Sequence, residues 1–408
     1  MESTQTKVGP YRWTLIILWI ACQATAWITV AVIGILLPAI SEEFQLSYVR
    51  QGLLSSVPTW INVILTIPFS LWLTRARPVL LTTVTLVFGV FLVYLQASAT
   101  IFIVLLISRL AFGMTLAVRE PARAILMQQW FQPREFILVN GVTATVITLT
   151  YATVMFATPL FLTSFNNNWR ATIYVLAGYS FVLTILWMIF ARDKAIQDDQ
   201  LSGEHKIGTL IKGIVRYKQI WITGLGFLGA TMTLGCFLAF YPTYMLDMHH
   251  FPLTFSGLVL ACSFLLGGPS SFTVSRITTT WQTRSKLLYI SGMILPISHI
   301  SLLLTDSLLL LLGIAMVNGI AWGVFWPILL TVTFHVYGIR PREIPIGHAF
   351  IFTAFSLGFA IGPLLGGLLQ DMFNNLGMVL IILSLTSVTV VLPGFFVSTL
   401  NEDPTQSH

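Results

Sequence analysis

Long apolar runs follow one another along this chain with little sequence between them. A helix needs about 20 apolar residues to cross the ~30 Å hydrocarbon core of a bilayer, and the sequence contains twelve such runs. Only 9% of the residues are charged, whereas an average globular protein has about 25%, so a water-facing surface could not be covered. The runs do not alternate apolar and polar residues as barrel strands would. The chain is therefore predicted to be an all-α polytopic membrane protein.

The twelve runs define the predicted transmembrane helices. In the first half they are Trp13–Ile40, Val49–Leu73, Val79–Gln96, Ile101–Gln129, Phe136–Phe165 and Ala171–Phe190. In the second half they are Ile220–Leu246, Phe255–Ser275, Leu287–Leu304, Ser307–Thr333, Ile346–Gln370 and Met378–Ser398. The three cysteines lie within these runs, at spacings that predict free, buried thiols.

Basic residues are distributed very unequally between the two sides of the predicted bundle. Of the 21 Lys and Arg residues, 16 fall in segments on the side of the N-terminus, and two, Arg50 and Arg170, fall on the other side. Cytoplasmic loops carry the excess of positive charge. We therefore expect both termini in the cytoplasm and the protein in the cell membrane (plasma or inner membrane).

The longest polar stretch, residues 192–218, lies between the sixth and seventh runs. Residues 206–218 read as a basic amphipathic helix on the cytoplasmic membrane surface, and residues 193–203 read equally well as a plain flexible linker. Pro133-Arg134-Glu135 after the fourth run recurs as Pro341-Arg342-Glu343 after the tenth, 208 residues later. Such repeats organise transporters. The repeat predicts two six-helix bundles, residues 1–191 and 219–408, joined by the linker 192–218.

Two sequence patterns carry a resemblance to a known family. The fourth run contains Leu105, Arg109 and Gly113 in a Leu-x-x-x-Arg-x-x-x-Gly pattern, and the eleventh contains a glycine-rich pattern formed by Gly358, Gly362, Pro363, Gly366 and Gly367. In both respects the chain resembles the major facilitator superfamily. The resemblance implies that family's fold of two pseudo-symmetric six-helix bundles.

Other details of the resemblance bear on the subfamily. The drug/proton antiporters of the superfamily carry the glycine pattern in the fifth helix, where this chain keeps Pro159 but has Val154, Thr158, Leu162 and Thr163 at the glycine positions. The loop after the second run has Thr74 where the family has an aspartate. Trp130-Phe131 followed by Arg134-Glu135 resembles the inner loop of the organic-anion and sugar-acid symporters.

The charged residues inside the membrane are confined to the fourth run. They are Arg109, Arg119, Glu120 and Arg123, and at about 100° per residue they project within an arc of about 100°. Ionisable residues inside a membrane are costly and mark functional sites. Arg109 and Arg119 are therefore candidates for binding an anionic substrate, because a guanidinium suits carboxylate or phosphate.

Each of these residues also has a structural interpretation. Arg109 could instead bond to carbonyls of neighbouring helices, and Arg123 could extend to the nearby inner interface. Glu120 could take up and release the proton that couples transport, or it could stay ionised as the partner of Arg123 in an inner gate. His299 is a further candidate for carrying a proton.

Polar and aromatic residues near the midplane are candidates for lining the substrate cavity, although tryptophan stripes also serve as packing surfaces. They are Gln23, Trp27, Tyr151, Tyr241, Asn318, Trp322 and Trp326.

The function predicted from these features is secondary active transport of a small organic or inorganic anion by alternating access, as proton-coupled symport. The alternatives are a drug/proton antiporter that exports lipophilic compounds and a non-transporting membrane sensor. No catalytic motif is present, so an enzyme is not expected. We expect no cofactor, no metal site, no nucleic-acid partner and a monomer in the bilayer.

Overall fold

The computed structural model describes residues 11–72, 77–131, 135–192, 216–277, 280–334, 336, 339 and 344–397, and helices form nearly all of these residues. No strand occurs among these residues. By length and hydropathy, eleven of the described segments could cross a membrane, and α2 lies among them in the same bundle. The predicted all-helical, polytopic architecture is confirmed.

The first half of the chain forms six helices. They are α1 (Tyr11–Phe44), α2 (Tyr48–Trp72), α3 (Pro78–Ala97), α4 (Phe102–Trp130), α5 (Phe136–Ser164) and α6 (Trp169–Phe190). The second half forms α8 (Lys218–His249), α9 (Leu253–Leu265), α10 (Gly267–Ile277), α11 (Trp281–Leu304), α12 (Leu308–Thr331), η4 (Val332–Phe334), α13 (Ile344–Phe373), α14 (Leu376–Leu385), η5 (Thr386–Val390) and α15 (Val391–Val397).

Two predicted spans are less regular than the sequence analysis expected. The eighth is divided into α9 and α10 at Leu266, directly before Gly267, Gly268 and Pro269. Proline lacks the N–H that would continue the helical ladder, and glycine weakens a helix interior. The twelfth consists of α14, η5 and α15. Pro393 has no N–H to donate to the backbone carbonyl four residues earlier, so the α-helical hydrogen bonds are interrupted in this span.

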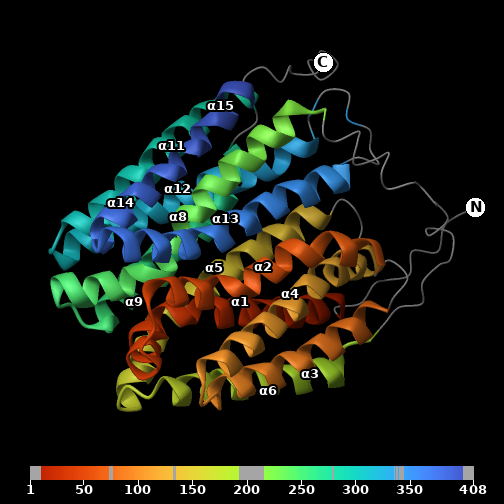
Figure 1. Cartoon of the computed structure of the whole chain (residues 1–408). Coiled ribbons are helices and arrows are strands. Elements are labelled where there is room, and N and C mark those ends of the chain that lie inside the picture. The colour runs from red at the N-terminus through yellow and green to blue at the C-terminus, as the bar shows by residue number, and fades with distance from the viewer. Residues whose placement is uncertain are drawn as a thin grey trace, which may run out of the picture.

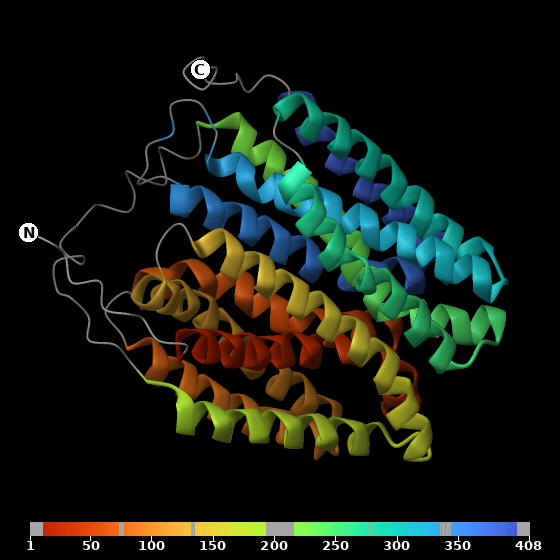
Figure 2. The same cartoon turned by 180° about the vertical axis from the view of Figure 1, so that it is seen from behind.

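The helices form two bundles that lie side by side. In Figure 1 the red-to-yellow helices α1–α6 occupy one side and the green-to-blue helices α8–α15 the other, and Figure 2 shows the same division from behind. Gly113 of α4 lies against Pro58 of α2, and Gly319 of α12 lies against Ser263 of α9. These two close helix crossings are separated by about 205 residues in the chain, so the bundles repeat each other in packing as well as in sequence.

The bundles meet mainly along three contacts, which are α1 with α8, α2 with α13, and α5 with the broken span formed by α9 and α10. Accordingly, α1 and α8 are the most buried of the eleven described segments that could cross a membrane. We call the end where α1 joins α2 and α13 joins α14 the outer end, because the charge distribution predicts that it faces outside. At this end the two bundles are in direct contact, through Tyr48 of α2 and Gly367 of α13.

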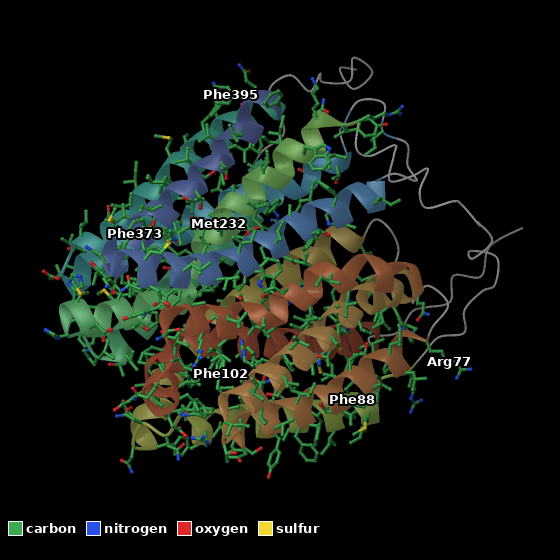
Figure 3. All side chains as sticks on the ribbon, viewed as in Figure 1. Arg77, Phe88, Phe102, Met232, Phe373 and Phe395 are labelled. Carbon is green, nitrogen blue, oxygen red and sulfur yellow. The ribbon has the colours of Figure 1, made fainter. Side chains whose placement is uncertain are left out.

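Large apolar side chains cover the outside of both bundles. Phe88 and Phe395 project from the periphery of the two bundles in Figure 3, and 60% and 57% of their surface is exposed. Such exposure suits a surface that faces lipid rather than water. The predicted amphipathic helix at 206–218 lies largely outside the described residues.

Candidate functional site

Arg109 lies at the centre of the N-terminal bundle and is completely buried. Its Nε donates to the carbonyl of Leu54 on α2, at 2.8 Å. Its terminal nitrogens donate to the carbonyls of Thr29 and Val30 on α1 and to Oε1 of Gln96 on α3, at 3.3 to 3.4 Å. These four acceptors occupy most of the five N–H donors of a guanidinium. The geometry favours the structural interpretation, in which Arg109 links α4 to three neighbouring helices.

Arg119 is also buried but has far fewer partners. Only 3% of its surface is exposed, and one terminal nitrogen donates to the carbonyl of Thr85 on α3, at 3.1 Å. Its Nε is buried and has no hydrogen-bond partner among the described residues. The side chain passes over Gly89 of α3, where a Cβ atom would lie 2.8 Å from its Nη2. Gly89 therefore makes the room that the guanidinium occupies.

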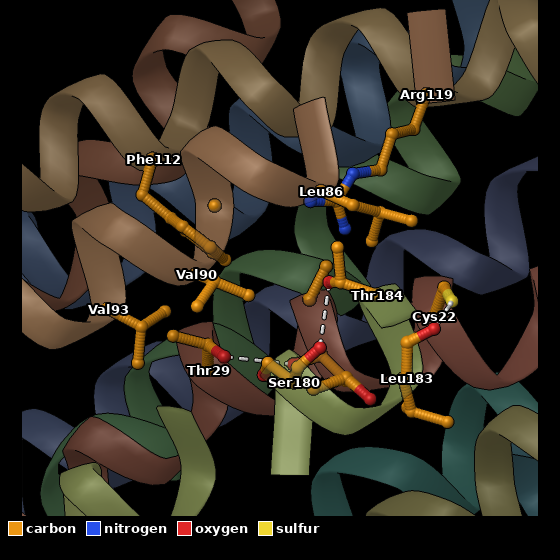
Figure 4. A pocket seen from close by; sticks show the side chains of 13 residues that line it. Cys22, Thr29, Leu86, Val90, Val93, Phe112, Arg119, Ser180, Leu183 and Thr184 are labelled. Atoms are coloured by element: carbon orange, nitrogen blue, oxygen red, sulfur yellow. Dashed lines mark hydrogen bonds between the residues drawn. The ribbon is translucent and has the colours of Figure 1, made fainter. Parts of the chain in front are cut away.

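A small cavity lies beside the Arg119 guanidinium (Figure 4). It is lined by helices of the N-terminal bundle alone: α1, α3, α4 and α6. The residues that line it are Cys22, Thr25, Ala26, Thr29, Leu86, Gly89, Val90, Val93, Phe112, Arg119, Ser180, Leu183 and Thr184. None of them is acidic, so the lining of the cavity carries one positive charge.

The hydroxyl groups that line this cavity donate hydrogen bonds to backbone carbonyls of their own helices. Thr25 and Thr29 donate to carbonyls four residues earlier on α1, and Ser180 and Thr184 do the same on α6. Arg119 is therefore the main free donor of the cavity. The cavity has a volume of about 10 Å³, which is room for about one water molecule.

Tyr151 lies near the middle of α5, where the two halves meet. Its ring stacks on Phe264 of α9, with ring centroids 5.0 Å apart, and its hydroxyl donates to the carbonyl of Trp27 on α1, at 3.4 Å. Trp27 is half-buried, and Gln23, one turn away on α1, is buried. The structure thus brings the predicted residues Tyr151 and Trp27 together across α1, α5 and α9.

The predicted site residues of α12 lie inside the C-terminal bundle. Asn318 donates to the hydroxyl of Ser298 on α11, at 2.8 Å, and adjoins the buried His299. Trp326 packs edge-on against Phe227 of α8 and Phe355 of α13. For Trp326 the contacts favour the packing role.

Two other predicted site residues of the C-terminal half have a buried hydrogen-bond donor without a partner in the described ranges. The indole N–H of Trp322 and the hydroxyl of Tyr241 are buried and have no hydrogen-bond partner among the described residues. Trp322 packs against Phe325, and Tyr241 stacks on Phe237. In the described part of the chain, neither residue is hydrogen-bonded to Asn318.

The side chains of Glu120 and Arg123 lie outside the part of the chain that the structure describes. Their helix, α4, is continuous through both positions. Their assignment to proton coupling or to an inner gate remains a prediction from the sequence.

The glycine-rich pattern of α13 places that helix between the two halves. A Cβ atom at Gly358 or Gly362 would lie 2.2 or 2.1 Å from a carbonyl oxygen of α8, and one at Gly366 would lie 2.7 Å from the Cys236 sulfur. On another face of α13, a Cβ at Gly367 would lie 2.2 Å from the carbonyl oxygen of Tyr48 on α2. The pattern therefore lets α13 touch α8 in its own half and α2 in the other.

Sequence reasoning missed the partners of these residues in the opposite half. Phe264, which stacks on Tyr151, is one of 29 phenylalanines, and nothing in its local sequence distinguishes it. Asn62 of α2 and Ser356 of α13 lie 3.5 Å apart across the interface. Asp371 of α13 bonds to the start of α2, and its position at the end of a predicted span was the available signal.

Comparison with known proteins identifies the family. The sequence profile of the Major Facilitator Superfamily matches residues 19–347. The chain belongs to the major facilitator superfamily. This family consists of transporters, so the expectation that the protein is a multi-pass membrane transporter rather than an enzyme is confirmed.

Three named proteins are similar to this chain at low sequence identity. The chain is 24% identical over 258 residues to the uncharacterized transporter YybO of Bacillus subtilis (strain 168), and the match spans 59% of each chain. The major facilitator fold is also found in a bacterial homologue of the human lysosomal transporter Spinster, with a TM-score of 0.81, 15% identity and 97% and 99% of the two chains covered. The nucleoside transporter NupG gives a TM-score of 0.73 at 13% identity, with 96% and 100% covered.

Proposed function

We propose that this major facilitator transports a small organic or inorganic anion by alternating access, coupled to protons, with Arg119 as the cation that holds the anion. The proposal rests on the buried Arg119 guanidinium, whose Nε has no hydrogen-bond partner among the described residues. The guanidinium lies beside a cavity whose lining has no carboxylate. A bound anion would supply both the missing acceptor and the missing negative charge.

The contrast with Arg109 supports this assignment. Both arginines are buried in the same bundle, but Arg109 has four acceptors and Arg119 has one among the described residues. Removing a charge from water is expensive unless partners replace its hydration. Arg109 has those partners within the protein, so Arg119 is the residue that gains from an external anion.

The cavity limits what Arg119 could hold in this conformation. With room for about one water molecule, it fits only a very small charged group, such as a halide-sized ion or one end of a carboxylate. Because α1 forms the wall between the cavity and the opposite half, we propose that a shift of α1 against α4 opens the cavity to the substrate pathway. Glu120, the next residue on α4, would carry the coupling proton.

The proposal can be tested by thermal unfolding of the purified protein in detergent with a panel of small carboxylates, inorganic anions and lipophilic cations. A ligand at 100 times its Kd should stabilise the native state by about 2.7 kcal/mol. We expect one class of anion to raise the midpoint and Arg119→Gln to abolish that shift. Arg50→Gln, which removes an exposed outer cation, should leave the shift intact.

Cys22 offers a second readout inside the same cavity. All three cysteines are free and buried, and only Cys22 lines this cavity. In a Cys236→Ser/Cys262→Ser background, the anion should slow the reaction of Cys22 with a small membrane-permeant thiol reagent. If no anion protects Cys22 or raises the midpoint, the assignment of Arg119 to anion binding is wrong.

A second candidate function is export of lipophilic compounds, and one observation favours it. The described residues that meet between the halves near the midplane, Tyr151, Phe264, Trp27, Asn62 and Ser356, are aromatic or neutral. An aromatic, uncharged surface suits an apolar ligand. Stabilisation by lipophilic cations alone, unaffected by Arg119→Gln, would favour this function over anion transport.

A further inference from the structure

The first turn of α2 depends on the opposite half of the protein for its hydrogen bonds. The backbone N–H groups of Tyr48 and Val49 donate to the two carboxylate oxygens of Asp371, each at 3.2 Å. The next two amides are bonded locally, because Arg50 N–H donates to the Ser47 hydroxyl and Gln51 N–H to the Ser47 carbonyl. The first four amides of a helix have no partner within it, and here Asp371 satisfies two of them.

Asp371 reaches α2 because glycines let the two helices touch. A Cβ atom at Gly52 would lie 2.2 Å from the carbonyl oxygen of Pro363, and one at Gly367 would lie 2.2 Å from that of Tyr48. Both contacts are to backbone atoms, so a larger side chain at either position would separate the helices. The Asp371 carboxylate lies one turn beyond Gly367, at the outer end of this crossing.

We propose that Asp371 is the latch of the outer gate of this transporter. Its carboxylate holds α2 against α13 while the outer end is closed, and the bond must break whenever the two halves part there. The positive end of the α2 dipole adds to the attraction, because an anionic group is stabilised near a helix N-terminus. Asp371 therefore sets how often the outer end opens, without contacting the substrate.

The latch differs from the other carboxylates at the outer end in what it joins. Glu43 pairs with Arg170, and both belong to the N-terminal half. Asp306 pairs with His249, and both belong to the C-terminal half. Asp371 belongs to the C-terminal half, and its side chain bonds to the N-terminal half.

Labelling of a buried position in the α2–α13 interface would test the latch. Thr59 lies almost two turns deeper than Gly52 on nearly the same face of α2, is 1% exposed, and its hydroxyl has no partner among the described residues. Thr59→Cys in a background in which Cys22, Cys236 and Cys262 are serine should react with a membrane-impermeant maleimide added outside intact cells only when the outer end opens.

Asp371→Asn should raise the rate of this labelling about fivefold, in line with the loss of one cap and dipole interaction. Glu42→Gln, which removes an exposed carboxylate from the same end of the molecule, should leave the rate unchanged. Equal labelling rates in Asp371→Asn, Asp371→Ala and the parent would overturn the proposal.

Hydrogen exchange gives a second measurement that does not depend on membrane orientation. In purified protein, the amides of Tyr48 and Val49 should exchange about fivefold faster in Asp371→Asn, while those of α9, which begins without a side-chain cap, should be unaffected. Unchanged exchange at Tyr48 and Val49 would contradict the latch. Neither experiment requires the substrate to be an anion, so the latch and the proposed role of Arg119 can fail independently.

Discussion

The two lateral interfaces between the halves are related by the internal repeat, but they are held together by different chemistry. The α2–α13 interface combines backbone contacts at Gly52 and Gly367 with polar bonds from Asp371 and Asn62. The α5–α9 interface combines a backbone contact at Gly257 with the aromatic stack of Tyr151 on Phe264.

The difference is clearest at the outer ends. Ser164 of α5 lies 207 positions before Asp371 (371 − 164), which is the spacing of the repeat, and its hydroxyl donates within its own helix to Leu160. The helix opposite, α9, begins at Leu253, and its N-cap residue, Pro252, provides no side-chain cap. A hydrogen-bonded contact has a defined geometry and is lost over a short distance, whereas a stacked pair can slide. We infer that the α2–α13 contact breaks in one step, whereas the α5–α9 contact persists while the two helices slide past each other over a short distance.

The largest effect is expected from a bulky residue at the α2–α13 crossing. Gly52→Val places a branched side chain where even a Cβ would lie 2.2 Å from the Pro363 carbonyl oxygen. Overpacking of this kind should lower the free energy of unfolding by about 3 kcal/mol and raise labelling at Thr59→Cys. Unfolding in a denaturing detergent would measure the first quantity.

Gly178→Val is the matched control, because nothing lies within 4 Å of a Cβ at Gly178. Gly257→Val should destabilise less than Gly52→Val, because a Cβ at Gly257 would lie 2.5 Å from the Met155 carbonyl oxygen, whereas one at Gly52 would lie 2.2 Å from that of Pro363. Equal losses for Gly52→Val and Gly257→Val would remove the distinction between the two interfaces.

An intermediate effect is expected at the α5–α9 interface. Tyr151→Leu removes the stack on Phe264 and the hydrogen bond to Trp27, which together should cost about 1.5 kcal/mol. Tyr151→Phe keeps the stack and should be close to the parent in the same unfolding experiment. Tyr179→Leu, at an exposed position of α6, controls for the loss of a tyrosine. A larger loss in Tyr151→Phe than in Tyr151→Leu would show that the hydroxyl, not the ring, holds this interface.

The smallest effect is expected from Ser356→Ala. Its hydroxyl lies 3.5 Å from the Asn62 side chain, which is at the limit of a hydrogen bond. The change should cost about 0.5 kcal/mol or less. If it costs as much as Tyr151→Leu, the polar contacts of α2–α13 extend to the midplane rather than being concentrated at Asp371.

The helices were predictable because their signal is local. Each span needs a run of apolar residues, and the observed bounds of α5 and the observed start of α2 lie within one residue of the predicted ones. The breaks at Leu266 and around Pro393 were not predicted, although Gly267-Gly268-Pro269 was visible in the sequence. A hydropathy window averages over such residues, and a short break changes the average little.

The candidate site was predictable only in part. A helical projection places Arg109 and Arg119 on one side of α4, and both side chains do point into the N-terminal bundle. The projection could not tell that, among the described residues, Arg109 would find four acceptors and Arg119 one, because those acceptors come from α1, α2 and α3. It also could not place the Arg119 cavity inside one bundle rather than between the two.

By itself, the sequence determined the class, the family and the register of this protein: helices that cross a membrane, two repeated halves, and glycines where helices must touch. These properties follow from hydropathy and from short patterns along one helix. Only the tertiary structure decided which buried arginine keeps a donor without a partner among the described residues and that the Asp371 carboxylate joins the halves. Asp371 is 323 residues from Tyr48, and contacts over such separations depend on how whole helices pack, which no local pattern specifies.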